Sequence, residues 1–242
     1  MRTTVTRTTM ALVALATSVV LAGCGAGTAS TPVAPVDDAA TSTVATPTPE
    51  PAPAAVAPGT VVMVIRHGEK PEDDDSGPGL DANGVEDDSS LTAVGWDRAH
   101  RLVDLFDPAQ GDPRPGLARP KAIYAAGAND NGEGQRTRET VQPLADRLGI
   151  PAVTTFGKGD EEKLIEHVLS QPGPTLISWQ HGEIPAMAEA FPGATPTPPT
   201  EWPDDRYDVI WTFTKTADGW QFAQLPELLL PQDQDSPIED EE

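Results

Sequence analysis

The chain has 242 residues and is strongly acidic, with 16 Lys and Arg against 38 Asp and Glu and a formal net charge of −22. A chain this negative is not expected to bind nucleic acid in general, because such binding needs a basic surface. The single cysteine excludes an intrachain disulfide framework and a cysteine-clustered zinc site. A hydrophobic fraction of 38% together with 26 prolines predicts a folded domain that carries polar appendages.

The N-terminus has the pattern of a cleaved export signal. Two arginines precede the short apolar stretch Met10–Leu21, and small residues follow it. The four residues Leu21–Cys24 resemble the bacterial lipobox, in which the cysteine becomes the new N-terminus and carries lipid. This resemblance implies a signal peptide over residues 1–23 and a lipid on Cys24 that anchors the chain at the extracytoplasmic face of the cell membrane. The alternative is a plain signal peptide with an incidental cysteine.

Composition divides the remaining chain into three parts. Residues 24–58 are rich in Ala, Pro and Thr and contain no aromatic, Leu, Ile, Lys or Arg residue, which predicts a disordered tether. Residues 59–230 have the size of one folded domain. Residues 231–242 are acidic and are predicted to be a solvated, disordered tail.

Within the domain, strand patterns alternate with helix patterns. Apolar runs predict strands over 61–65, 121–125, 152–156 and 175–179, and periodic apolar positions predict helices over 92–106, 136–148 and 160–169. Two more strands, 207–213 and 220–222, flank an Asp-Gly turn typical of hairpins. This alternation predicts a single-domain, three-layer α/β/α sandwich with a mostly parallel sheet.

Cationic and imidazole side chains follow three of the predicted strands. Arg66, His67 and Lys70 come directly after the first strand, Arg136 follows the second, and His181 follows the strand over 175–179. Ligands of such folds bind beyond the carboxyl ends of the strands. We therefore expect these five side chains to converge on an anion site that contains a nucleophile. Either histidine taken singly could instead be a hydrogen-bonded structural residue.

Four blocks in order resemble the histidine phosphatase superfamily, which has the phosphoglycerate-mutase-like fold. They are Arg66-His67-Gly68, the Leu-Thr-x-x-Gly start of a helix at 91–95, the strand 123–125 with Arg136 and Thr140, and the strand-His-Gly block over 176–182. The resemblance covers roughly residues 60–224. The loop before Arg136 departs from the family pattern, because it is longer and lacks a serine. Arg138 is an alternative to Arg136.

The resemblance implies a role for each of these residues. His67 would be the nucleophile that takes the phosphoryl group, with Arg66 and Arg136 holding its oxygens. His181, kept protonated by the bound anion, would donate another hydrogen bond, and Lys70 would add positive charge to the phosphate site. Neither a metal nor an organic cofactor is required.

The leaving oxygen also needs a general acid. Glu183 is the first candidate from its place two residues after His181, and Glu69 and Asp130 are the alternatives. The acidic stretch 73–88 could collect calcium, although its spacing fits no ordered ligand loop and a solvated insertion is the other interpretation.

These observations predict a phosphatase that hydrolyses a small phosphomonoester through a phosphohistidine outside the membrane. Specificity would depend on the loops 71–90 and 192–206. A non-catalytic envelope lipoprotein that binds an anion or a partner in the same pocket is the alternative. A phosphomutase is a third interpretation, which the export signal disfavours because the usual glycolytic substrates of mutases are not expected outside the cell.

Overall fold

A computed structural model describes residues 56–71, 77–128 and 133–240 of the chain. The predicted signal peptide, Cys24 and most of the predicted tether lie outside the described residues. Among the helices of the described part, none has the length and apolar character needed to cross a membrane.

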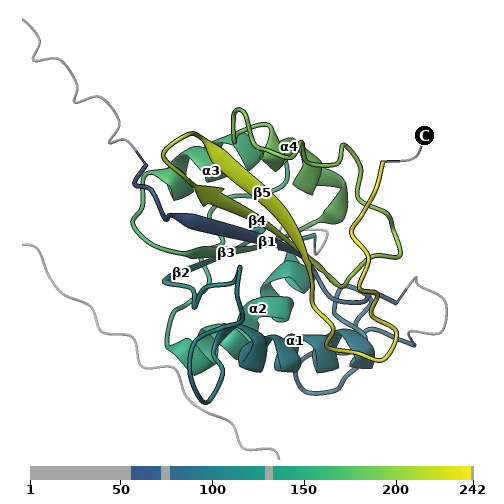
Figure 1. The fold of residues 1–242 in the computed structure, drawn as a ribbon. Helices are drawn as coiled ribbons and strands as arrows, with labels where there is room; N and C mark the ends of the chain where they lie inside the picture. The colour runs from purple at the N-terminus through teal and green to yellow at the C-terminus, as the bar shows by residue number, and fades with distance from the viewer. Residues whose placement is uncertain (1–55, 72–76, 129–132, 241–242) are drawn as a thin grey trace, which may run out of the picture. The chain divides into compact units, whose positions relative to one another are not determined.

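The domain is built on one five-stranded sheet in the order β2-β3-β1-β4-β5 (Figure 1). The strands are β1 (Val61–Arg66), β2 (Ala122–Ala125), β3 (Thr175–Trp179), β4 (Val209–Lys215) and β5 (Trp220–Pro226). β3 runs parallel to both β1 and β2, whereas β4 is antiparallel to β1 and to β5. The sheet is therefore mixed, and the prediction of a mostly parallel sheet was wrong. The cause is the hairpin of β4 and β5, whose first strand lies beside β1 and runs antiparallel to it.

The helices begin and end within one residue of their predicted bounds. They are α1 (Ala93–Phe106), α2 (Gln135–Leu148) and α3 (Glu161–Leu169), with a 3₁₀ turn η1 (His181–Glu183) and the short helix α4 (Ile184–Ala188) after β3. The strand predicted over 152–156 is absent. Only Val153 forms a bridge, through two hydrogen bonds to the edge strand β2.

Two apolar clusters lie between the sheet and the helices, one on each face of the sheet. Side chains alternate along a strand, so Met63 and Ile65 of β1 pack with α1 and α2, while Val62 and Val64 pack on the opposite face with α3 and α4. Figure 1 shows the two helix pairs on either side of the sheet. The structure thus has the predicted three layers.

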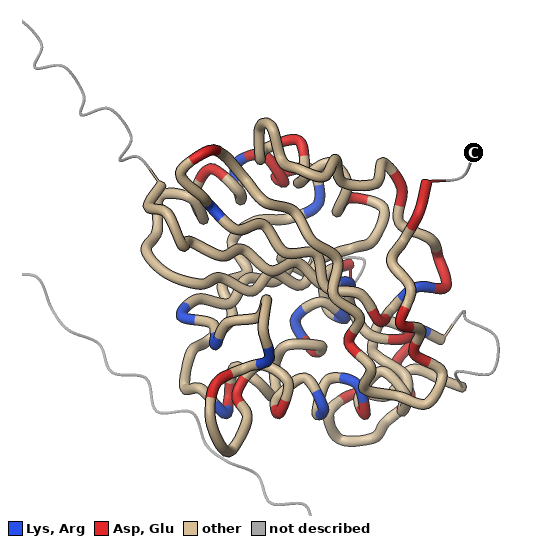
Figure 2. The backbone as a smooth tube through the Cα atoms, in the orientation of Figure 1, with Lys and Arg blue, Asp and Glu red and all other residues tan. Residues whose placement is uncertain are grey.

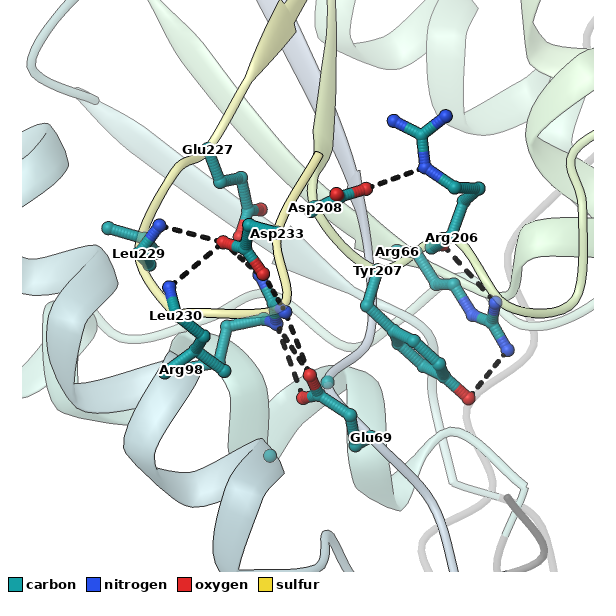
Figure 3. A network of polar contacts seen from close by, with 12 residues as sticks. Arg66, Glu69, Arg98, Arg206, Tyr207, Asp208, Glu227, Leu229, Leu230 and Asp233 are labelled. Carbon is teal, nitrogen blue, oxygen red and sulfur yellow. Dashed lines mark hydrogen bonds and ion pairs between the residues drawn. The ribbon is translucent and has the colours of Figure 1, made fainter. Parts of the chain in front are cut away.

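The C-terminal segment packs against the domain, contrary to the prediction of a solvated tail over 231–242. Ile238 is buried in the core, and Asp233 binds the buried guanidinium of Arg98 at 2.7 Å. Glu69 and Glu227 bind the same guanidinium at 2.8 and 2.7 Å (Figure 3). Acidic composition suggested solvation here, but Asp233 is a partner that a buried cation requires.

Candidate active site

The loop after β1 is fixed by a hydrogen bond from α2. The backbone N–H of Gly68 donates to Oγ1 of Thr140 at 2.8 Å, and the Thr140 hydroxyl donates to the carbonyl of Arg136 at 2.7 Å. Thr140, four residues after Arg136, therefore joins α2 to the loop after β1 that begins with His67, called the histidine loop below. This contact links the block that contains His67 to the block that contains Arg136 and Thr140.

The N-terminus of α1 holds the same loop from another side. The backbone N–H of Thr92 donates to the carbonyl of Glu69 at 3.0 Å, and the Thr92 hydroxyl caps the helix by accepting from Gly95. A Cβ at position 95 would lie 2.7 Å from the Glu69 carbonyl oxygen. The Leu-Thr-x-x-Gly block thus serves a close approach between helix and loop, for which only glycine is small enough.

His67 is 6% exposed and its tautomer is fixed by the loop. Nδ1 lies 2.8 Å from the carbonyl oxygen of Gly68. Because a carbonyl oxygen only accepts, we assign the ring proton to Nδ1, which leaves the lone pair on Nε2. Burial, followed by the charge of Arg66, lowers the pKa of His67 to about 3. The imidazole is therefore neutral at physiological pH, as a nucleophile must be.

A cavity of about 390 Å³ opens beside His67. Five of the predicted site residues line it, namely His67, Lys70, Arg136, His181 and Glu183. The structure therefore brings together side chains from the ends of β1 and β3 and from the start of α2. Six further residues complete the lining: Glu133, Gly134, Thr137, Lys158, Gln180 and Gly182.

Arg136 rather than Arg138 belongs to this cavity. The guanidinium of Arg136 is held by the backbone of the preceding loop, through Nε to the carbonyl of Ser90 at 3.2 Å and through Nη2 to the carbonyl of Asp88. Arg138 lines a separate groove that includes Gln142.

Arg66 is placed differently from the expectation. It is 1% exposed and is not among the residues that line the cavity. Its Nη1 donates to the backbone carbonyls of Pro203, Asp204 and Arg206, and its Nη2 donates to the hydroxyl of Tyr207 at 2.8 Å. Figure 3 shows the guanidinium beside Tyr207. The predicted role of Arg66 as a phosphate ligand stays a prediction, since these nitrogens face protein oxygens in the structure.

His181 is paired with a carboxylate that the sequence did not single out. Its Nε2 lies 2.6 Å from Oδ1 of Asp204. Burial is the largest influence and lowers the pKa of His181, and nearby Arg66 lowers it further, whereas Asp204 raises it. The ring is therefore harder to protonate than an ordinary histidine. The predicted protonated state would depend on an incoming anion.

The structure separates the candidate general acids. Glu69 is excluded, because its carboxylate is buried against Arg98 and does not line the cavity. Asp130 lies outside the described residues. Glu183 lines the cavity and forms an ion pair with Lys158 at 2.8 Å, which raises the pKa of that lysine. Glu133 also lines the cavity, and the sequence analysis did not consider it as an acid although it lies in the loop just before Arg136.

The acidic stretch 73–88 shows no calcium site where it is described. Asp81 accepts hydrogen bonds from the backbone of Asn83 and Val85, and Asp87 accepts from Ser89 and Gln135, so both carboxylates hold turns. Within the described ranges, no group of three or more metal-binding side chains occurs.

Comparison with known proteins gives structural likenesses only. No protein-family model and no curated protein matches the chain. The chain is similar to a solved structure of the protein histidine phosphatase SixA complexed with tungstate, with 16% identity, a TM-score of 0.45, and coverage of 69% of this chain and 97% of that one. It is also similar to a structure described as mycobacterial hydrolase 2, with 12% identity, a TM-score of 0.40, and coverage of 69% and 90% of the two chains.

Replacing His67 by glutamine should make the protein less sensitive to acid. The unfolded imidazole has a pKa of about 6.5 and binds a proton that the folded one rejects, so wild-type stability falls as the pH drops through that value. Between pH 7 and pH 5 we expect the wild type to lose about 2 kcal/mol more unfolding free energy than His67→Gln. Urea unfolding at both pH values measures this difference, with His100→Gln, at an exposed histidine, as the matched control. Equal losses in wild type and His67→Gln would contradict a buried, neutral ring.

Proposed function

We propose that this protein is a phosphatase that hydrolyses a small phosphomonoester through a phosphohistidine intermediate on His67. The observation that carries the proposal is the state of His67. It is a neutral imidazole whose Nδ1 is bound to the Gly68 carbonyl, in a cavity shared with Lys70, Arg136 and His181. A lone pair on Nε2 among several cationic or protonatable groups suits attack on an anionic phosphorus centre.

In the first step, Nε2 of His67 bonds to phosphorus as the ester P–O bond breaks, and the leaving oxygen takes a proton from an acid. In the second step, a water molecule attacks the phosphohistidine and gives its proton to the same group. Inorganic phosphate leaves and His67 is restored. Arg136 and Lys70 offset the charge on the non-bridging oxygens during both steps.

Glu183 remains the first candidate for the acid because it lines the cavity two residues after His181. Its carboxylate lies 2.8 Å from Nζ of Lys158, which also lines the cavity. Glu133 is the second candidate. An ester whose leaving group is itself acidic would need neither residue.

A second candidate function is anion binding without turnover in the same cavity. The observation that favours it is the contact between Asp204 and His181, together with the engagement of Arg66 by the backbone of 203–206. In this arrangement two of the predicted phosphate ligands, Arg66 and His181, already contact oxygen atoms of the protein. Covalent labelling separates the two functions.

We also propose that the protein acts at the extracytoplasmic face of the cell membrane, anchored by lipid on Cys24. The support is the sequence alone: a basic start, a short apolar stretch and the Leu-Ala-Gly-Cys pattern.

A phosphoenzyme should form on His67. We expect rapid quenching with a phosphate-labelled aryl ester to trap label that is stable in alkali and lost in acid, and peptide mapping to place it on His67. His67→Ala should carry no label. Label on a serine, or full activity of His67→Ala, would overturn the proposed intermediate.

The two cavity residues Glu183 and Arg136 should differ in their dependence on the leaving group. Glu183→Gln should lose roughly 10²–10⁴-fold in kcat/KM on alkyl esters and far less on esters of acidic phenols, which leave without a proton. Arg136→Ala should slow both classes alike, because it acts on the phosphoryl oxygens that they share.

Rates across a series of leaving-group pKa values measure this, with Glu133→Gln run in parallel. A flat ratio for Glu183→Gln together with a steep one for Glu133→Gln would transfer the acid role to Glu133. A steep ratio for Arg136→Ala would contradict its assignment to the phosphoryl oxygens.

Replacing Cys24 with serine should release the protein from the membrane fraction. Stable attachment needs more than one acyl chain, so loss of the acylated cysteine removes the whole anchor. Fractionation and immunoblotting of wild type and Cys24→Ser measure the distribution. Unchanged membrane association of the variant would contradict the lipobox interpretation.

A further inference from the structure

The loop before β4 reaches into the candidate active site with its oxygen atoms. This segment, Pro203–Tyr207, is called here the Asp204 loop. Three of its backbone carbonyls accept hydrogen bonds from Nη1 of Arg66, and the guanidinium carbon of Arg66 lies 3.6 Å from the centre of the Tyr207 ring. The loop thus surrounds Arg66, one of the donor side chains that the phosphatase resemblance assigns to phosphate.

The side chain of Asp204 contacts another of these donors, His181. Its Oδ1 lies 2.6 Å from Nε2 of His181. The other ring nitrogen of His181, Nδ1, is buried and has no hydrogen-bond partner among the described residues. Nε2 is therefore the nitrogen through which His181 can meet a ligand in the cavity, and a carboxylate already occupies it.

We propose that Asp204 is an internal competitor for the anion site, and that a phosphoryl group reaches His181 only when this carboxylate leaves it. The inference rests on the proposed function, because it takes His181 as a phosphate ligand. A carboxylate and a phosphoryl group both present oxygens with negative charge to the same N–H donor. One donor cannot serve both groups at full strength, so the carboxylate lowers the apparent affinity for phosphate.

The high exposure of the Asp204 side chain indicates that it competes with an anion for His181, and does not serve to orient the His181 ring. A carboxylate that orients a catalytic histidine is usually buried and held by other groups, and it binds the ring nitrogen remote from the substrate. The Asp204 side chain is 87% exposed, and it binds the nitrogen nearer the solvent. It can leave His181 for water by rotation of its own side chain, without unfolding of the loop.

The loop itself is held in place by the C-terminal segment. Nη2 of Arg206 donates to the carbonyl of Ser236 at 2.7 Å, and Nε of Arg206 donates to Asp208 at 2.8 Å. Figure 3 shows Arg206, Asp208 and Tyr207 side by side with Arg66. Because the backbone is fixed in this way, the Asp204 carboxylate stays close to His181 and competes with an incoming anion at a high local concentration.

Binding of inorganic phosphate to the intact chain, measured by calorimetry, tests the proposal without requiring turnover. Asp204→Ala should bind phosphate about five- to tenfold more tightly than the wild type, because it removes both a competitor and a like charge at contact distance. Asp205→Ala is the matched control: it removes the same charge from an exposed neighbouring residue and should change the affinity by less than twofold. In steady-state kinetics Asp204→Ala should lower KM without lowering kcat.

Unchanged or weaker phosphate binding by Asp204→Ala would overturn the proposal, and so would a fall in kcat, which would identify Asp204 as a positioning residue for His181. Equal tightening in Asp205→Ala would also overturn it, because the effect would then be one of net charge. Tighter phosphate binding by Asp204→Ala in a protein that forms no phosphoenzyme would support the competitor and reject the phosphatase.

Discussion

The buried guanidinium of Arg98 is the interaction on which the site depends most. It projects from α1 and binds three carboxylates that are distant in sequence: Glu69 in the loop after β1, Glu227 directly after β5, and Asp233 in the C-terminal segment. A buried cation without partners would be strongly destabilising, so each carboxylate is required where it lies. The histidine loop, the last strand and the C-terminal segment are thereby fixed to a single point.

This network carries more acid than base, which has a consequence for protonation. Burial raises the pKa of Glu227 to about 8, whereas its ion pair with Arg98 works in the opposite direction. Glu227 is therefore protonated more easily than an ordinary glutamate, even though it contacts the Arg98 guanidinium. Arg98 binds both carboxylate oxygens of Glu69. Although Glu69 is only two residues from His67 in the sequence, its carboxylate is therefore not available to the cavity.

The sequence predicted the local elements well and their arrangement less well. The helices follow from apolar periodicity and from local end signals: Thr92 caps the start of α1, Pro108 comes two residues after its end, and Gly149 caps the end of α2. The direction of β4 relative to β1 could not be predicted in this way. The hairpin pattern around Gly219 specifies how β4 pairs with β5, but it does not specify which strand lies on the other side of β4. Likewise the edge segment around Val153 has an apolar pattern but makes only one bridge to β2.

The same distinction holds in the site. Residues directly after strands converge because strand ends meet at one edge, and His67, Lys70 and His181 could be predicted on that ground. Asp204 could not, because its position depends on the path of a loop whose anchors, such as Ser236, lie some 30 residues further along the chain. Nor does the pattern Arg-His-Gly reveal that the Arg66 guanidinium faces backbone carbonyls of that loop.

The charges around the cavity determine how strongly the Asp204 loop can affect the binding of an anion. The chain has a net charge of −22, and acidic positions outnumber basic ones along the C-terminal segment and the loop before β4 (Figure 2). A distant charge is screened over about 10 Å at ordinary ionic strength, so an anionic ligand in the cavity responds mainly to its nearest neighbours. There Lys70, Arg136 and Lys158 attract it, while Glu133 and Glu183 repel it. In a site this evenly balanced, the position of one further carboxylate on His181 is enough to decide whether an oxyanion or the protein's own side chain occupies the donor.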